Sequence, residues 1–130
     1  KKKLENGESS QRFKISGEAY KAKDDGFRMK DVTSGDAGGD VAKVGDRVVM
    51  KYKGTLQSDG YVFDQANRFE FVLGAGDVIK GWDRGIVGMV VGMKRELVCP
   101  PALAYGKRGS PPDIPANSTL CFTVTLKAIK

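Results

Sequence analysis

The chain has 130 residues, which suits one domain, and 40% of them are hydrophobic, enough to bury a core. Its 17 glycines exceed the usual share of about 7%, which favours a turn-rich antiparallel β fold over a helical bundle. The net charge is +6, and the chain has no histidine and only two cysteines. A zinc site therefore lacks a ligand set, and histidine-dependent catalytic triads are excluded. No apolar run approaches the roughly 20 residues of a membrane helix.

The positive charge is concentrated near the start of the chain. Residues 1–30 hold nine Lys or Arg and five Asp or Glu, and the first ten residues are polar enough to predict disorder. This stretch is interpreted either as a solvated tail or as the end of a basic region that binds nucleic acid or carries a nuclear signal. It has neither an initiator Met nor the apolar core of a signal peptide, which suggests a fragment or a processed chain.

The first half of the chain predicts strands joined by turns. Short strands are expected at 12–16 and 18–23 and again after Gly26, followed by a Gly/Asp loop and a turn at Gly45-Asp46. Residues 46–56 alternate with strand period, and the two expected faces are Val48, Met50 and Tyr52 against Arg47, Val49, Lys51 and Lys53. Asp59-Gly60 signals a hairpin turn before a further alternating segment at 68–74.

The stretch "VIKGWDRGIVGM", residues 78–89, contains the only tryptophan. Val78, Trp82 and Ile86 are four residues apart, so they predict one apolar face of a short helix, with Asp77 as its N-cap. Glycines before and after Trp82 make this a poor helix in isolation, so packing must hold it. Because glycine has no side chain, the glycines beside Trp82 also indicate that another element packs closely against this segment.

The second half predicts a strand ending at Cys99, a proline-rich loop at 101–118 and a closing strand at 119–129. The whole chain therefore predicts an α+β fold, in which about five antiparallel strands carry one short helix on one face. Cys99 and Cys121 lie in strand-like apolar segments. Two buried reduced thiols are the favoured interpretation, and a disulfide is the alternative.

Aromatic residues come from strands, helix and loop, in numbers that suit either a core or a pocket. For Phe71 we favour the core. Tyr52 and Tyr105 carry hydroxyls that need partners when they are buried. Asp64 follows Phe63 in an apolar segment, so its carboxylate is either a solvated turn residue or a paired, functional one.

Three motifs stand in order along the chain: "GYVFD", then "F-x-F-x-L-G-x-G-x-V-I-K-G-W-D-x-G-x-x-G-M", then "AYGKRG" followed by "IPANSTLCFTVTL". Together they resemble the FK506-binding protein (FKBP) family of peptidyl-prolyl cis-trans isomerases. The resemblance covers residues 28–130 as one isomerase domain and leaves 1–27 as a basic, partly disordered extension. The segment "CPPALAYGKRGSPP" is most similar to that of the nuclear and nucleolar, nucleoplasmin-like members of the family.

The resemblance implies a curled sheet wrapped around a short helix, with a proline-binding pocket between them that is floored by Trp82. The positions that match the family's pocket are Tyr52, Phe63, Asp64, Phe69, Val78, Ile79, Trp82, Tyr105, Ile114 and Phe122. Four of these match its catalytic positions, namely Asp64, Tyr105, Phe63 and Trp82. If Asp77 caps Lys80, the backbone N–H of Ile79 stays free for a substrate carbonyl. Asp64 is expected to bond Tyr52.

The implied activity is rotation of X-Pro peptide bonds without a nucleophile, metal or cofactor. The implied partners are proline-containing polypeptides and the macrolides FK506 and rapamycin, bound by a monomer that does not enter membranes. Only "QANR" separates Asp64 from Phe69, so Arg68 is the candidate to pair with Asp64. The charged loop tip around Lys107 and Arg108 argues against drug-induced complexes with a phosphatase or kinase.

The alternative is a binding module or part of a histone chaperone, recruited to histones or nucleic acid through the basic extension. The subgroup resemblance implies a nuclear or nucleolar location, with the cytoplasm as the alternative.

Overall fold

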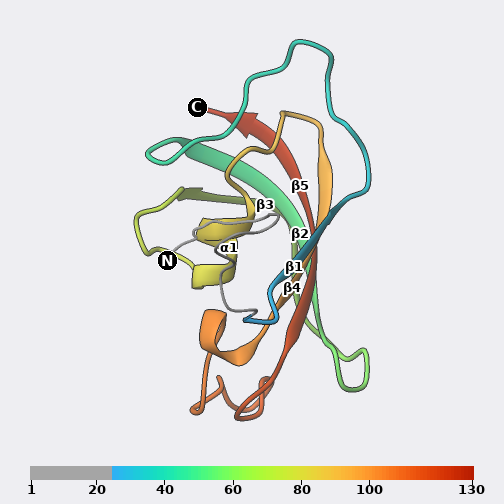
Figure 1. Cartoon of the computed structure of the whole chain (residues 1–130), viewed down its shortest axis with the longest axis vertical. Coiled ribbons are helices and arrows are strands. Elements are labelled where there is room, and N and C mark those ends of the chain that lie inside the picture. Colours follow the sequence, from blue (N-terminus) through green and yellow to red (C-terminus); the bar gives the residue numbers. More distant parts are fainter. Residues whose placement is uncertain (1–24) are drawn as a thin grey trace, which may run out of the picture.

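The structure is a computed structural model that describes residues 25–130 (Figure 1). The strands predicted at 12–16 and 18–23, and the disorder predicted for residues 1–10, lie outside the described residues. Among residues 25–130, no helix is long and apolar enough to cross a membrane. The same part of the chain holds no group of three or more His, Cys, Asp or Glu residues that could bind a metal ion.

Within residues 25–130, five antiparallel strands form one curled sheet, and helix α1 lies against its inner face (Figure 1). The order across the sheet is β1-β4-β5-β2-β3, so the last strand in sequence occupies the centre. The predicted α+β architecture is confirmed. The elements are β1 (Arg28–Asp31), β2 (Arg47–Leu56), β3 (Val62–Val72), α1 (Lys80–Gly85), β4 (Lys94–Cys99), the 3-10 turn η2 (Pro101–Leu103) and β5 (Leu120–Ile129).

The predicted hairpin turn between β2 and β3 is confirmed. Gly60 has a positive φ of 78°, which glycine adopts without steric cost, and its N–H donates to the carbonyl of Leu56. The carboxylate of Asp59 accepts a hydrogen bond from the N–H of Tyr61 at 2.9 Å. The Asp59 side chain and the Gly60 backbone thus both stabilise the turn between β2 and β3.

Strand β2 departs from the simple alternation predicted for it. Val48 and Met50 are buried as expected, but Val49, expected on the charged face, is buried as well. Between Val49 and Met50 the pairing of β2 with β5 shifts register. A shift of this kind puts two successive side chains out of alternation, which a pattern of period two cannot anticipate.

Glycines allow helix α1 to lie directly on strand β4. A Cβ atom at Gly81 would collide with the sulfur of Cys99, and one at Gly85 would lie 2.7 Å from a methyl carbon of Leu97. In both cases the added Cβ atom would lie closer to its neighbour than side-chain atoms in proteins do. The close neighbour that the glycines beside Trp82 predicted is therefore strand β4.

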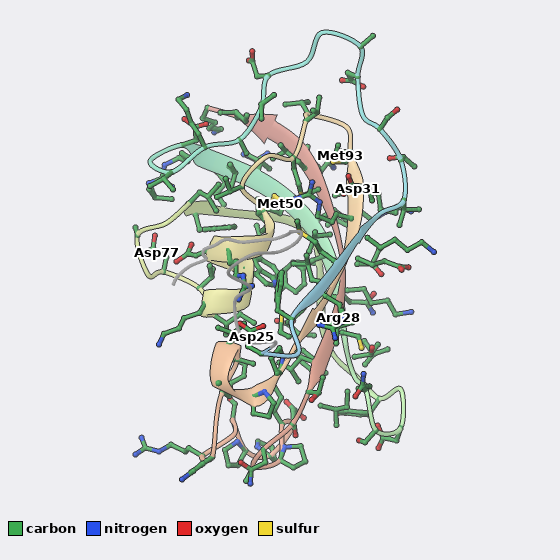
Figure 2. The ribbon with its side chains drawn as sticks, in the orientation of Figure 1. Asp25, Arg28, Asp31, Met50, Asp77 and Met93 are labelled. Atoms are coloured by element: carbon green, nitrogen blue, oxygen red, sulfur yellow. The ribbon has the colours of Figure 1, made fainter. Side chains whose placement is uncertain are left out.

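The prediction that Asp77 caps the helix is wrong. The helix begins at Lys80 with Ile79 in the N-cap position, and no side chain bonds to the cap. Asp77 lies earlier, in the connection between β3 and α1 (Figure 2), and its carboxylate accepts a long 3.4 Å hydrogen bond from the N–H of Val72. The helix starts two residues later than the cap rule placed it, so Asp77 is too far from the first turn.

Arg95 is a buried cation that the sequence analysis did not single out. Its guanidinium donates to the carboxylate of Asp31 at 2.6 Å and to the carbonyls of Gly85 and Val87 at 2.8 and 3.2 Å. Its remaining nitrogen lies 3.8 Å from the sulfur of Met93; Asp31 and Met93 are labelled in Figure 2. One side chain on β4 therefore ties the end of α1 to the edge strand β1.

Both cysteines are free, as favoured from the sequence. Cys99 is buried under helix α1, and burial raises the pKa of its thiol to about 12. Cys121 is partly exposed on the neighbouring strand β5. The thiol of Cys99 stays neutral at physiological pH and behaves as a small apolar core residue.

Candidate active site

Trp82 lies at the centre of an aromatic cluster between helix and sheet. Its side chain is only 4% exposed, and four rings surround it from strands β2, β3 and β5. The distances from the indole centroid are 4.9 Å to Tyr52, 5.3 Å to Phe122, 5.8 Å to Phe71 and 6.1 Å to Phe69. Most of these contacts are edge-to-face, the arrangement that aromatic quadrupoles prefer. Phe71 is fully enclosed, as predicted for a core residue, whereas Phe69 is 37% exposed.

The indole nitrogen of Trp82 has no hydrogen-bond partner within the described residues, although it is buried. A buried donor without an acceptor costs about 1–3 kcal/mol of desolvation. The fold therefore retains the indole of Trp82 at this buried position although its unpaired N–H group is unfavourable.

Tyr52 and Asp64 pair across strands β2 and β3. The phenol donates to the carboxylate at 2.6 Å, which confirms the predicted hydrogen bond. Burial, then the hydrogen bond and the charge of Asp64, raise the pKa of Tyr52 above its usual 10.0. Arg68, expected as the partner of Asp64, instead forms an ion pair with Glu70 at 2.6 Å. The carboxylate of Asp64 is therefore held by a neutral donor and remains exposed.

The raised pKa of Tyr52 predicts a loss of stability in alkali. The folded state holds the phenolic proton more tightly than the unfolded state, so its contribution is complete below pH 10 and is lost as the pH rises further. We expect the free energy of unfolding of the native protein to fall relative to that of Tyr52→Phe between pH 10 and 12. Urea titrations followed by circular dichroism measure the difference. A gap that stays constant over this range would contradict the assignment.

Val78 and Ile79 lead into helix α1 beside Trp82, and both are half-buried against the core. The carbonyl of Ile79 accepts hydrogen bonds from the N–H groups of Trp82 and Asp83. Its own N–H donates to no acceptor within residues 25–130. The free donor that the resemblance required is therefore present, although Asp77 does not act as the cap.

Phe63 and Phe122 meet edge-to-face at 5.7 Å above Gly54 of strand β2. A Cβ atom at Gly54 would lie 2.6 Å from Phe63 and 2.8 Å from Phe122, so glycine makes room for both rings. Ile114, in the loop before β5, is buried in the same core cluster as Trp82. Matched residues of strands β2, β3 and β5, of helix α1 and of the loop before β5 thus belong to one apolar cluster.

Tyr105 follows the turn η2 and is 43% exposed. Its hydroxyl forms no hydrogen bond within the described part of the chain. The phenol of Tyr52 is thus engaged by Asp64, whereas that of Tyr105 is free to donate.

The model of the FKBP-type peptidyl-prolyl cis-trans isomerase family matches residues 38–127. The chain belongs to this family. The match contains the whole aromatic cluster, the Tyr52–Asp64 pair and helix α1. Rotation of X-Pro bonds is the activity for which the family is named.

Curated relatives of this FKBP domain include proteins from insects, fungi and plants. A 46 kDa FK506-binding nuclear protein of Spodoptera frugiperda is 50% identical over 108 residues, 81% of this chain and 26% of the relative. A 39 kDa FK506-binding nuclear protein of Drosophila melanogaster is 54% identical over 94 residues, 70% of this chain and 26% of the relative. The peptidyl-prolyl cis-trans isomerase FKBP15-2 of Arabidopsis thaliana is 49% identical over 92 residues, 68% of this chain and 56% of the relative. The chain therefore spans 26% of the length of the two nuclear relatives.

Asp83 is a site residue of the FKBP domain that the sequence analysis missed. Its carboxylate accepts hydrogen bonds from the N–H groups of Gly74 and Gly76, at 2.8 and 3.1 Å. Both glycines have positive φ and lie in the loop that leads to Val78 and Ile79. Asp83 thus fixes that loop to the helix that carries Trp82. The aspartate beside the tryptophan, nine residues after a Gly-x-Gly turn, was the available signal.

Replacing Asp83 with alanine is expected to loosen this loop. Two backbone donors lose their acceptor, so we expect isomerase kcat/KM to fall about fivefold and stability to fall by about 1–2 kcal/mol. Asp77→Ala is the matched control, because its only hydrogen bond is long and exposed. Peptide isomerisation assays and thermal melts of both variants test the prediction. Equal activity in the two variants would show that the loop does not depend on Asp83.

Proposed function

We propose that this domain catalyses rotation of X-Pro peptide bonds in the pocket above Trp82. The observation that carries the proposal is the aromatic cluster around Trp82, beside which we place an apolar slot for the substrate. Phe69 and Val78 remain partly exposed, whereas the rings of Trp82 and Phe122 in the same core cluster are buried. A pyrrolidine ring is apolar and of about this size, and such a site excludes water from the bond beside it.

Polar groups around the slot are suited to hold the substrate backbone. The free N–H of Ile79 is the proposed donor to one carbonyl, and the free hydroxyl of Tyr105 is the proposed donor to another. Asp64 is proposed to hold Tyr52 and Phe63 in the pocket wall. With Trp82 as the floor, these residues form the proposed catalytic set, and Ile114 completes the lining.

The chemistry requires no covalent step. The barrier to rotation is about 18–20 kcal/mol because the planar amide is stabilised by resonance. The twisted amide has lost this conjugation, so its oxygen carries less charge and water stabilises it less. An apolar pocket therefore favours the twisted form, and an acceleration of about 10⁴-fold requires roughly 5.4 kcal/mol of such preference. Desolvation and two hydrogen bonds are of this magnitude.

The proposed partners are proline-containing polypeptides, with FK506 and rapamycin as competitive ligands of the same slot. Two relatives are named as FK506-binding nuclear proteins, which supports both drug binding and a nuclear location. The proposed organisation is an isomerase domain over 28–130 preceded by a basic extension over 1–27.

Exchange spectroscopy by NMR on a Leu-Pro peptide, with and without rapamycin, tests the proposal. Accelerated exchange that rapamycin abolishes is the expected result, and Trp82 fluorescence would then report ligand affinity. Drug binding without any acceleration would overturn the catalytic proposal and leave a binding module with an isomerase fold.

Binding of histones or nucleic acid through residues 1–27 is a separate proposal, supported by the excess of Lys and Arg near the start of the chain. Deleting residues 1–27 tests it, with Trp82 fluorescence as the check that the pocket is intact. Loss of binding on deletion is the expected result. Retention of binding would assign it to the folded domain.

A further inference from the structure

One face of the sheet points away from α1 (Figure 1), and it is rich in lysine. Alternation along the strands puts charged and hydroxyl side chains on this face, opposite the core residues. Five exposed lysines lie here and form no ion pair within residues 25–130. They are Lys30, Lys51, Lys53, Lys94 and Lys127. Glu96, opposite Lys30 in the pairing of β1 with β4, lies on the same face.

Three of these lysines border a hollow of about 380 Å³. Thr125 of the central strand β5 pairs with Lys51 of β2 on one side and with Lys94 of β4 on the other. Lys53 pairs with Thr123 in the next row. Neighbouring strands are about 4.8 Å apart, so lysines on β2 and β4 flank the threonines across about 10 Å. We call this hollow the lysine groove; its lining is Lys51, Tyr52, Lys53, Gln65, Ala66, Asn67, Lys94, Thr123 and Thr125.

We propose that the lysine groove binds an extended acidic polypeptide segment. Along an extended chain, side chains i and i+2 point the same way and are about 6.8 Å apart. Lys51 and Lys53 have this same spacing because they stand two residues apart on one strand. A carboxylate at i+1 would point to the opposite side, toward Lys94. Three consecutive Asp or Glu residues therefore match the three lysines, one carboxylate to each.

The floor of the groove suits a peptide backbone. The hydroxyls of Thr123 and Thr125 and the amides of Gln65 and Asn67 can donate to peptide carbonyls. None of these four side chains forms a hydrogen bond within the described part of the chain. The groove thus offers both the charges for the side chains and the donors for the main chain.

The same observations disfavour nucleic acid in this groove. Single strands bind on aromatic platforms, and the only aromatic ring in the lining, Tyr52, packs edge-on against Trp82 and bonds Asp64. Duplex binding of useful strength takes about six to ten phosphate contacts, whereas the groove supplies three lysines.

Fluorescence anisotropy with a labelled octaglutamate peptide and the full chain tests the proposal. The groove variant is Lys51→Gln/Lys53→Gln/Lys94→Gln. The matched control, Lys80→Gln/Lys107→Gln/Arg108→Gln, removes the same charge from exposed positions outside the groove. We expect the groove variant to bind about tenfold more weakly and the control to bind within about twofold of the native protein. Thermal melts verify that both variants are folded.

Amide shifts in ¹⁵N spectra locate the peptide independently of the variants. Shifts on β2 and β5 around Lys51 and Thr123 are expected, together with no binding of octaglutamine. Equal loss in both variants would show attraction to net charge alone, and shifts confined to the rest of the chain would place the peptide elsewhere. A 20-base-pair duplex that displaces the peptide from these residues and binds more tightly would show a nucleic-acid site. Each of these three results would overturn the proposal.

Discussion

Replacing Arg95 with alanine is expected to lower the free energy of unfolding by about 3 kcal/mol. The guanidinium is buried, and its loss would leave the carbonyls of Gly85 and Val87 without their donor. It would also remove the ion pair between Arg95 and Asp31, which leaves the edge strand β1 held by its pairing with β4. Denaturant unfolding followed by far-UV circular dichroism measures the effect.

Arg84→Ala is the matched control for this experiment. Arg84 also pairs with an aspartate, Asp25, at 2.6 Å, but both side chains are nearly half exposed. Exposed pairs contribute about 0–1 kcal/mol, so the control should remain close to the native protein. If the two variants lose similar stability, burial of the cation is not what makes Arg95 important.

Replacing Trp82 with leucine is expected to lower both stability and catalysis. The indole contacts four rings, so we expect a loss of about 2–3 kcal/mol in the free energy of unfolding. Because the pyrrolidine ring would lose its floor, we also expect kcat/KM for a Leu-Pro peptide to fall at least about tenfold. The protease-free NMR assay measures the second effect.

Phe71→Leu separates the two effects. Phe71 is buried next to Trp82 but is enclosed by the core, so its truncation should cost stability without a matching loss of kcat/KM. Comparable loss of activity in both variants would mean that the rate follows general stability and that Trp82 has no special place in the pocket.

Much of the fold could be predicted because strand alternation is a local property. The closing strand at 119–129 and the turn at Asp59-Gly60 follow from neighbouring residues alone. The pocket residues were identified by motif resemblance, because no local sequence pattern predicts that Tyr52 on one strand contacts Trp82 on a later helix. The structure confirms the hydrogen bond between Tyr52 and Asp64 that was expected from the resemblance.

The errors concern interactions between segments distant in sequence or choices between nearby partners. Arg68 stands two residues before Glu70 on β3, so the two side chains point the same way and pair, whereas Asp64 pairs with Tyr52. Arg95 was not singled out from the sequence, because only the folded chain shows that α1 ends beside its guanidinium. The helix start moved from Asp77 to Ile79, since backbone packing of glycines on β4 outweighs a cap preference of about 1 kcal/mol.

The central position of β5 has a consequence for how the chain folds during synthesis. Until residues 120–129 have been made, β1 can pair only with β4, and β2 only with β3. Two-stranded ladders of this kind are marginal in water. A nascent chain therefore presents two incomplete half-sheets, with the apolar side of β2 uncovered, until the last ten-residue strand joins them. The domain's demand for chaperones should be greatest just before that strand emerges.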